Sequence, residues 1–452
     1  MSDRTIIDGC ALATMDAAGT EYERGHIVIE GNRIAAIGSG AAAAEDGATV
    51  IEGAGLLATP GLVNSHHHLY QWLTRGLAQE ATLFEWLTEL YPRWALIDDE
   101  MQDAAARAGL AALLLSGCTT SMDHHYVFPR GAGDLLGIEI GAAADLGIRF
   151  HPTRGSMDLG VSDGGLPPDS VTETTDEVLV ATEAAIDRHH DASFDSMLRI
   201  AVAPCSPFSA TEELMKEAAA LARRKDVRLH THLAETVDEE EFCLERFGAR
   251  PTDYLDSLGW LGDDVWLAHC IHLSDADVAR FGATGTGVAH CPTSNARLGA
   301  GIARVVDLTA AGVPVGLGVD GAASNEGGTL SSEPRAALHL ARLRGGPAAL
   351  TARDALRLAT MGGARCLGRS AEIGSLEGGK LADIALWKMD GLEDAGIEDK
   401  VAALVLGTPR PAHHVVVNGR VVVEAGELKT ADRSSIGAGL DKQARRLTEA
   451  FS

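Results

Sequence analysis

Residues 60–68 read Pro-Gly-Leu-Val-Asn-Ser-His-His-His, and the fold of the whole chain can be inferred outward from this stretch. A short apolar run that ends in polar side chains is typical of a buried strand with chemistry at its carboxyl end. On a strand, positions i and i+2 point to the same side, so His66 and His68 can reach one ion. A lone His-Xaa-His motif is a weak sign of a metal site, so the remaining strands decide its meaning.

Seven further segments repeat the pattern of an apolar run that ends in polar residues. Together with the segment that ends at His68, they give eight expected strands: residues 63–68, 119–124, 148–154, 200–206, 229–235, 266–272, 287–294 and 315–320. Segments rich in alanine and leucine, such as 103–116 and 210–224, lie between them and are expected to be helices. Eight strands that alternate with helices predict an α/β protein with a (β/α)8 TIM barrel. Catalytic groups of such barrels lie at the carboxyl ends of the strands.

The two ends of the chain have a different pattern. Apolar runs at 27–29 and 34–37 are separated by Gly31-Asn32-Arg33, which predicts a hairpin. The runs at 415–417 and 421–423 flank Asn418-Gly419, a strong hairpin signal. We therefore expect a small β-sandwich domain built from residues 1–58 and 376–452, and a barrel at 59–375.

Composition and charge exclude several classes of protein. The 452 residues carry a formal net charge of -26 at pH 7, which repels phosphate backbones and anionic lipids. We therefore expect no nucleic-acid partner and no membrane partner, but a small-molecule substrate. The chain starts without a basic segment that precedes an apolar one, and no run of about 18 apolar residues occurs. Seven cysteines without a Cys-Xaa-Xaa-Cys motif indicate reduced thiols, so we expect a cytoplasmic protein.

Three later strand ends also carry groups suited to chemistry. Residues 229–235 read Leu-His-Thr-His-Leu-Ala-Glu, residues 266–270 read Trp-Leu-Ala-His-Cys, and residues 316–321 read Gly-Leu-Gly-Val-Asp-Gly. Together with residues 60–68 they resemble the amidohydrolase superfamily, and the resemblance covers almost the whole chain. Residues 60–68 and the run His-Cys-Pro-Thr-Ser-Asn at 290–295 are similar to one branch of it. That branch contains guanine deaminases, adenosylhomocysteine-type deaminases and triazine hydrolases.

The resemblance implies a metal-dependent hydrolase. It implies a metal ion held by His66, His68, His232 and Asp320, a proton-shuttling Glu235, and His269 near the reacting carbon. Three neutral imidazoles and a carboxylate suit Zn²⁺ and leave room for water, with Fe²⁺ as the alternative ion. The ion would lower the pKa of that water from 15.7 towards about 7, so that hydroxide attacks the substrate at neutral pH.

Three of these residues have expected catalytic roles. Asp320 would accept the proton of the attacking water. Glu235 would carry a proton to a ring nitrogen and then to the departing amine. His269 would donate to the oxygen that develops at the attacked carbon, and so would also contact the substrate.

The number of ions is inferred from missing lysines. Two-metal members of the superfamily often bridge their ions with a carboxylated lysine at a strand end, commonly the fourth. This chain has no lysine before Lys216, and the expected fourth strand at 200–206 contains none. We therefore expect one ion per subunit.

Residues near the strand ends indicate the substrate. Gln71 lies three residues after His68, the offset at which guanine deaminases carry a glutamine that contacts the purine edge. Trp86 matches a tryptophan that lines the pocket of nucleoside-type deaminases and could cover a flat ring. Arg154, at the end of the third strand, is expected to meet a carbonyl oxygen. Cys205 lies where guanine deaminases have arginine, so the pocket departs from plain guanine recognition.

The segment His-Leu-Tyr-Gln-Trp-Leu-Thr-Arg-Gly at 68–76 resembles 8-oxoguanine deaminases. That resemblance implies hydrolytic deamination of 8-oxoguanine to urate and ammonia. Guanine, pterin and triazine deaminases and triazine chlorohydrolases stay open, because one hydroxide can attack each activated carbon. A departing amine needs an acid such as Glu235, whereas chloride does not, so deamination is favoured. A non-enzymatic scaffold of the same fold is the alternative from another class, but such relatives have typically lost the ligand set.

The sequence assigns no single role to four further histidines. His124 and His125 could line the pocket mouth or bind metal, and neither His272 nor His290 has an assigned role. His230 is expected to pack in the core, because it points away from His232. A homo-oligomer, dimeric or larger, is also expected.

Overall fold

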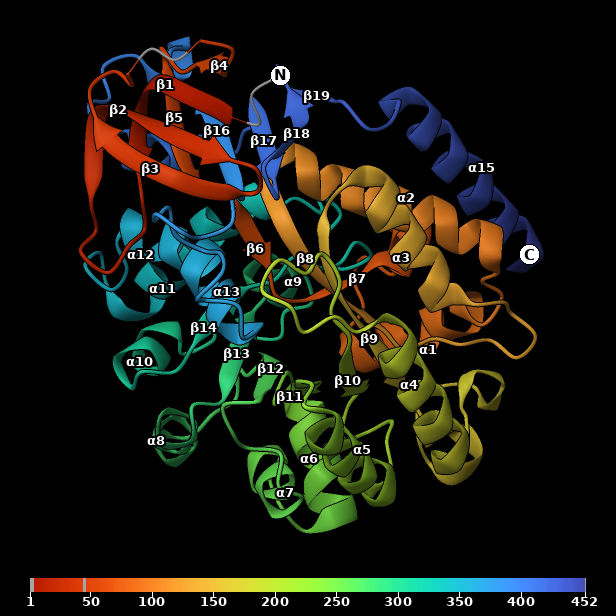
Figure 1. Ribbon diagram of the computed structural model, residues 1–452. Coiled ribbons are helices and arrows are strands. Elements are labelled where there is room, and N and C mark those ends of the chain that lie inside the picture. The colour runs from red at the N-terminus through yellow and green to blue at the C-terminus, as the bar shows by residue number, and fades with distance from the viewer. Residues whose placement is uncertain (1–3, 44–45, 452) are drawn as a thin grey trace.

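The structure, a computed structural model, describes residues 4–43 and 46–451. Its centre is a closed barrel of parallel strands (Figure 1). The barrel strands are β6 (Leu62–Asn64), β8 (Cys118–His125), β9 (Arg149–Ser156), β10 (Ala201–Pro204), β11 (Leu229–Leu233), β12 (Val265–His269), β13 (Gly287–His290) and β14 (Val315–Leu317). They follow one another around the barrel in chain order, and β14 closes onto β6. The predicted (β/α)8 barrel is confirmed, because each expected strand segment overlaps one of these strands.

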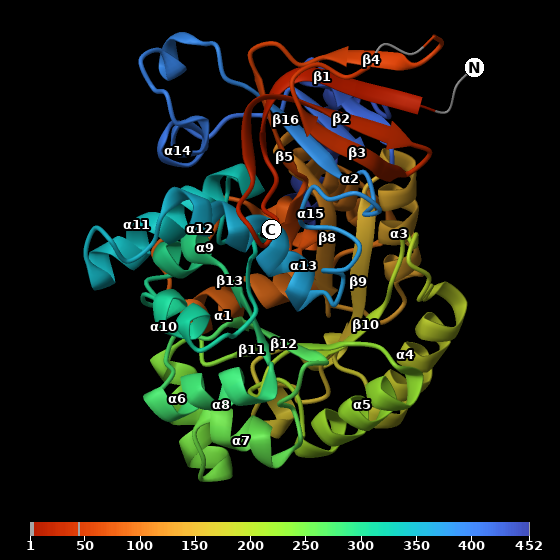
Figure 2. The ribbon, with the colours of Figure 1, turned by 60° about the vertical axis from the view of Figure 1, so that its left-hand side comes forward.

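Helices follow the strands and cover the outside of the barrel (Figures 1 and 2). They are α1 (Leu83–Trp94), α2 (Asp99–Leu115), α3 (Leu135–Leu146), α4 (Thr175–His189), α5 (Glu212–Lys225), α6 (Val237–Phe247), α7 (Pro251–Ser257), α8 (Asp275–Thr284), α9 (Pro292–Arg297), α10 (Val305–Ala310), α11 (Glu333–Gly345), α12 (Ala352–Arg357) and α13 (Gly363–Cys366). Local sequence sets their ends. The Thr211 side chain accepts from the Leu214 N–H at the start of α5, and Asp226 ends that helix in the left-handed region.

The first barrel strand is shorter than expected. β6 ends at Asn64, so His66 lies beyond it rather than on it. His67 and His68 form a second short strand, β7, which pairs with β15 (Asp320–Gly321). The pairing is tied by the Asp320 N–H, which donates to the His66 carbonyl at 3.1 Å. The carboxyl ends of the first and last barrel segments are thereby held directly beside each other.

The two chain ends form one nine-stranded sheet on one end of the barrel (Figure 2). Its strands are β1 (Arg4–Ala13), β2 (Glu21–Glu30), β3 (Arg33–Ser39), β4 (Thr49–Glu52), β5 (Leu56–Pro60), β16 (Ile384–Lys388), β17 (His414–Val417), β18 (Arg420–Glu424) and β19 (Glu427–Leu428). β5 and β16 are antiparallel neighbours and join the N-terminal to the C-terminal strands. Asn418 and Gly419 both have positive φ, as a two-residue hairpin turn between β17 and β18 requires.

Two C-terminal helices were not expected from the strand-like pattern of this region. They are α14 (Lys400–Leu406) and α15 (Arg433–Phe451). α15 buries Leu440 and Leu447 and lies along the barrel helix α2 rather than against the sheet (Figure 1). In the described ranges no helix combines the length and apolar character that crossing a membrane requires.

A buried ion pair fastens the sheet to the barrel. Arg149 on β9 donates to both carboxylate oxygens of Asp383, at 3.0 and 2.9 Å, and neither side chain is more than 1% exposed. Asp383 precedes β16 and also accepts the Asn418 N–H of the β17–β18 turn at 2.8 Å. The pair therefore links a barrel strand to two segments of the sheet.

Arg149→Met should destabilise the protein by about 3–5 kcal/mol, because it leaves the Asp383 carboxylate buried without its partner. The free energy of unfolding can be measured by urea denaturation. The matched control is Arg188→Met, which breaks the exposed pair of Arg188 with Asp134 and should leave stability unchanged within error. Equal stability of the two variants would contradict this role of the buried pair.

Candidate active site

Four side chains converge at the carboxyl ends of the barrel strands. His66 Nε2 and His68 Nε2 each lie 3.3 Å from Asp320 Oδ1, and His68 Nε2 lies 3.1 Å from His232 Nε2. All four residues are buried. The structure thus brings together the four residues expected to be metal ligands, although they are separated by up to 254 positions in the sequence.

Hydrogen bonds to the far side of each ring fix where its lone pair points. His68 Nδ1 donates to the His124 carbonyl at 2.8 Å, and His232 Nδ1 donates to the Cys205 carbonyl at 2.6 Å. Burial lowers the pKa of His232 well below its ordinary value, so this ring is neutral. A carbonyl can only accept, so both rings carry a proton on Nδ1, and Nε2 is the atom that faces the cluster.

His66 is oriented through a second histidine. The Trp266 carbonyl can only accept, so His230 donates to it from Nδ1 at 2.8 Å. His230 Nε2 therefore accepts from His66 Nδ1, at 2.8 Å. This leaves the buried His66 Nε2 as a lone pair without a hydrogen-bond partner in the described ranges. His230 is buried as expected, and it also supports a ligand.

The cluster fits a divalent metal ion. Three nitrogen lone pairs and a carboxylate oxygen at 3.1–3.3 Å would repel one another without a cation between them. A tetrahedral shell with Zn–N bonds of about 2.0–2.1 Å places neighbouring ligand atoms about 3.3 Å apart. The donor types and their spacing are therefore those of a zinc-type site.

The backbone around the site is strained. Ala234, His269 and Asp320 have φ values of 51°, 69° and 61°, a region that non-glycine residues rarely adopt. Such residues cost about 1–3 kcal/mol each and persist where surrounding contacts hold them. Here the Ser294 hydroxyl holds Asp320 Oδ2, and the Glu239 carboxylate accepts the Ala234 N–H at 2.8 Å.

Glu235 and His269 lie next to the ligand cluster. The Glu235 carboxylate is 3.5 Å from His269 Nε2, and both side chains are buried. Burial, reinforced by the charge of Asp320, raises the pKa of Glu235 well above its ordinary value. This shift favours the protonated form of the Glu235 carboxyl group. Asn295 Oδ1 lies 2.9 Å from His269 Nδ1 and fixes the ring so that Nε2 faces Glu235 and Asp320.

A cavity opens onto this cluster and contains four of the five expected substrate contacts. Gln71, Trp86 and Cys205 line it together with His68, His232, Glu235, His269 and Asp320. Gln71 Oε1 is buried and has no hydrogen-bond partner in the described part of the chain. Gly321 makes room for this amide, since a Cβ there would lie 1.7 Å from Oε1. An unsatisfied amide in an enclosed cavity is a group that a ligand can satisfy.

The structure does not bring Arg154 into this cavity. Its guanidinium is already used by Glu173 at 2.7 Å and by the Gly155 carbonyl at 2.7 Å. It also lies over the Phe128 ring, with 3.6 Å between Cζ and the ring centroid. Arg154 is therefore not retained as a substrate contact. Its position at a strand end was visible in the sequence, but the direction of its side chain was not.

The remaining histidines have structural partners. His125 shares Glu139 at 2.9 Å and the Val127 carbonyl, and His272 contacts the Ala300 carbonyl at 3.0 Å. His124 supports His68 through its carbonyl and is buried. None of these, nor the buried His290, lines the cavity. His124 and His125 therefore lie behind the site rather than at its mouth.

Sequence reasoning missed several apolar and phenolic walls of the cavity. The additional lining residues include Leu83, Leu87, Tyr91, Tyr126, Phe208 and Leu298. The first three share the face of α1 that carries Trp86, so the helical spacing around Trp86 was a usable signal. Tyr126 directly follows β8, and its position past a strand end was a second signal. Phe208 and Leu298 lie in loops for which the sequence has no comparable sign.

The cavity is narrow as the structure stands. Its volume is about 30 Å³, well below the range of about 300–1,000 Å³ that is usual for small-molecule sites. A heterocyclic ring therefore needs more room than these walls leave, and α1, Phe208 and Leu298 form a part of the wall that contains no metal ligand.

Comparisons with known proteins agree with this site. A profile of the amidohydrolase family matches residues 57–422. The 8-oxoguanine deaminase of Pseudomonas aeruginosa is 47% identical, with 94% of this chain and 95% of that protein covered. The hydroxydechloroatrazine ethylaminohydrolase of Pseudomonas sp. is 37% identical over 96% and 94% of the two chains. A crystal structure of atrazine chlorohydrolase from Arthrobacter aurescens, complexed with zinc, has a TM-score of 0.93 at 36% identity and covers 97% and 100%.

His68→Ala should lower the bound divalent metal of the purified protein strongly, because it removes one of three nitrogen ligands. Metal content can be measured by plasma mass spectrometry. His272→Ala is the control, since this ring is only partly buried and lies outside the cluster. Chelation should also lower the melting temperature of the wild type, since an ion that binds only the folded state stabilises it. Unchanged metal in His68→Ala would contradict the ligand assignment.

Proposed function

The chain belongs to the amidohydrolase family, and on that premise we propose that it is a metal-dependent aminohydrolase of 8-oxoguanine. The reaction replaces the exocyclic amino group by oxygen: 8-oxoguanine and water give urate and ammonia. The observation that carries the proposal is the identity of 47% to an 8-oxoguanine deaminase over 94% of the chain. The buried Glu235 next to the ligand cluster, whose pKa is raised above its ordinary value, supports the removal of an amine.

His66, His68, His232 and Asp320 would hold the metal ion. When bound, the ion supplies a Lewis acid that lowers the pKa of a water molecule towards about 7. Asp320 Oδ1 faces His66 and His68, while Oδ2 is held by Ser294 and faces His269 at 3.8 Å. This carboxylate is placed to take the proton that the attacking water loses.

Glu235 would transfer protons to and from the substrate. In its protonated form it donates to the ring nitrogen next to the attacked carbon, so that the ring carries no negative charge as the new C–O bond forms. The Glu235 carboxylate would then take the hydroxyl proton of the tetrahedral carbon and pass it to the amino group, which leaves as neutral ammonia while the carbonyl forms. The proton that Asp320 took from the water returns Glu235 to its protonated form. His269, held by Asn295, faces the same point and would donate to the oxygen of the attacked carbon.

The walls of the cavity would hold the heterocycle. The Gln71 amide offers one acceptor and a pair of donors, which match the adjacent N–H and carbonyl groups of an aminopurine edge. The Trp86 ring is fixed by its Nε1–H, which donates to the Ala323 carbonyl at 3.3 Å. This leaves its face for stacking on a flat ring. Cys205, Tyr91 and Tyr126 would complete the lining of the cavity.

The proposal includes one ion per subunit, Zn²⁺ with Fe²⁺ as the alternative. It is supported by the absence of lysine from β10 and from the residues that follow it as far as α5. The seven cysteines are free and buried, which suits a reducing compartment such as the cytoplasm. We also propose a homo-oligomer, dimeric or larger, which light scattering can test.

Purified protein loaded with zinc should release ammonia from 8-oxoguanine faster than from guanine, isoxanthopterin or an aminotriazine. Ammonia can be followed with a coupled dehydrogenase assay, and urate by its ultraviolet absorption. A chlorotriazine in the same panel tests the alternative reaction through release of chloride. If no member of the panel yields ammonia, the deaminase proposal fails.

Glu235→Gln should keep the metal but lower kcat by about 10²–10⁴-fold, because the amide cannot deliver a proton. Metal content and steady-state rates on the preferred substrate are the measurements. Glu241→Gln on the exposed side of α6 is the matched control and should behave as wild type. A rate for Glu235→Gln close to wild type would remove this residue from proton transfer.

Gln71→Leu should mainly affect recognition of the ring edge. The loss of two hydrogen bonds predicts a kcat/KM for 8-oxoguanine that is lower by about 10–100-fold. Gln79→Leu, at an exposed glutamine that donates to the Gly76 carbonyl, is the control. An unchanged kcat/KM in Gln71→Leu would show that the ring is held by other groups.

A further inference from the structure

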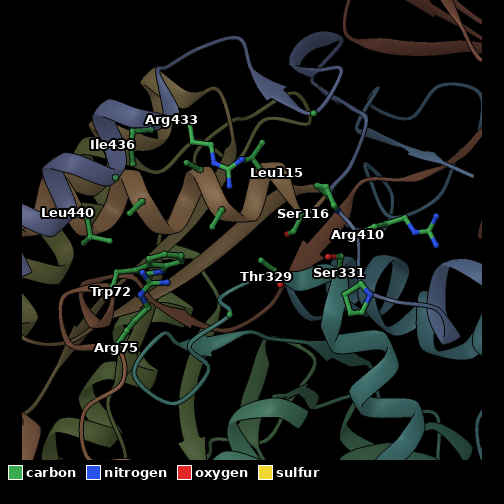
Figure 3. Close-up of a pocket in the computed structure, with 18 residues that line it drawn as sticks. Trp72, Arg75, Leu115, Ser116, Thr329, Ser331, Arg410, Arg433, Ile436 and Leu440 are labelled. Carbon is green, nitrogen blue, oxygen red and sulfur yellow. The ribbon is translucent and has the colours of Figure 1, made fainter. Parts of the chain in front are cut away.

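A second cavity lies outside the barrel and shares no lining residue with the active-site cavity (Figure 3). Its volume is about 570 Å³, within the range of about 300–1,000 Å³ that is usual for small-molecule sites. α2 forms one wall with Ala108, Ala112 and Leu115, and α15 forms another with Ile436 and Leu440. The 3₁₀ turn η1 (Leu69–Thr74) and the segment 327–331 border it from the barrel side.

The charge of this cavity is opposite to that of the protein. The chain has 64 acidic and 38 basic residues, yet none of the 18 lining residues is acidic and three are arginines. Arg410 is already paired with Asp394 at 2.8 Å. Arg433 extends from α15 towards Leu115 (Figure 3), and within residues 4–43 and 46–451 it has neither a hydrogen bond nor an ion pair. Arg433 is thus a free cation above an apolar wall.

Arg75 provides a second cation at the other side of the cavity. Its guanidinium lies 4.4 Å from the centroid of the Trp72 ring and, within the described ranges, makes one hydrogen bond, to the Glu326 carbonyl at 3.3 Å. Figure 3 shows the Arg75 and Trp72 side chains beside each other. An apolar surface that is flanked by two unpaired guanidinium groups fits a molecule with an apolar ring body and one anionic group. It fits a neutral or cationic ligand poorly.

The cavity is mechanically linked to the active site through η1. Gln71 points into the active-site cavity, and the next residue, Trp72, lines the outer cavity. The indole is tightly held, since a Cβ at Gly109 would lie 2.7 Å from its Nε1 and a Cβ at Gly328 would lie 2.6 Å from Cζ2. η1 begins directly after His68. A ligand that presses on Trp72 therefore acts on the turn that carries Gln71.

We propose that this outer cavity is an effector site for an amphipathic organic anion, an apolar ring system with one carboxylate, sulfonate or phosphate group. Arg433 binds the anionic group, the apolar faces of α2 and α15 bind the ring body, and Arg75 with Trp72 borders the far side. Occupancy is coupled to substrate binding through Trp72 and Gln71. The binding site stands on its own geometry, whereas the coupling rests on the proposed function of Gln71.

The probe for binding is 8-anilinonaphthalene-1-sulfonate with the zinc-loaded full chain. A saturable fluorescence increase with one site per chain is expected, and Arg433→Gln should weaken it by about tenfold through loss of a charge-assisted hydrogen bond. Ala112→Trp should abolish it by filling the cavity. The neutral N-phenyl-1-naphthylamine has the same ring system without the sulfonate, and its binding should not depend on Arg433. Arg188→Gln, an exposed arginine far from the cavity in the chain, is the charge control and should bind as wild type.

Probe binding that is unchanged in both Arg433→Gln and Ala112→Trp would overturn the site. A change of molecular mass in solution on Ala112→Trp would overturn it too, because the cavity would then be a contact between copies of the chain. Melting temperatures of both variants near that of the wild type exclude misfolding as the cause of lost binding.

Coupling is measured separately, with the heterocycle that releases ammonia. The sulfonate should change the KM of the wild type by at least about twofold and leave the KM of Ala112→Trp unchanged. By linkage, the same heterocycle bound to Glu235→Gln should change the Kd of the sulfonate by the same factor. Independent binding of the two ligands would overturn the effector role. If no heterocycle releases ammonia, the proposed function fails. The fluorescence titration still shows whether the outer cavity binds the sulfonate.

Discussion

Three imidazole lone pairs and one carboxylate oxygen face the same point at the mouth of the barrel, and the surrounding structure serves to keep them there. Each ring is oriented by a hydrogen bond from its Nδ1. His68 donates to the His124 carbonyl and His232 to the Cys205 carbonyl. His66 donates to His230, which in turn donates to the Trp266 carbonyl. The arrangement would be repulsive without a cation. The hydrogen bonds on the far side of each ring therefore commit the fold to binding an ion.

The same constraint explains the irregular features around the site. β6 stops at Asn64, so that the chain can turn His66 inward before β7 pairs with β15. Asp320 adopts positive φ, which directs one carboxylate oxygen at the histidines and leaves the other with Ser294. The short β7–β15 pairing places the segment after the first barrel strand directly beside the segment after the last one. His66, His68 and Asp320 can therefore face the same point, although they come from the two ends of the barrel sequence.

Sequence reasoning succeeded where a residue's role follows from its position along a strand. The eight strand segments are confirmed, and the structure brings together the four residues expected to bind metal and the expected proton shuttle Glu235. All share one signal, an apolar run that ends in a polar group at the carboxyl edge of a barrel. The same reasoning was wrong about where Arg154 points, because Glu173 and Phe128 compete for its guanidinium. It also missed α15, whose short apolar stripe is hard to separate from the strand-like pattern before it. The missed walls of the cavity, Phe208 and Leu298, come from loops without periodicity.

By itself the sequence determined the barrel, the β-strands at both chain ends, the family resemblance and the choice of four candidate ligands, because strand period and strand-end chemistry are local properties. Only the tertiary structure decided the orientation of each ring, the raised pKa of Glu235, the partner of Arg154 and the outer cavity between α2 and α15. These depend on contacts between segments that lie far apart in the chain. His66 and His230, for example, are 164 positions apart, and their hydrogen bond cannot be inferred from either neighbourhood. The sequence thus supplies the candidate ligands, and packing brings their donor atoms to one point.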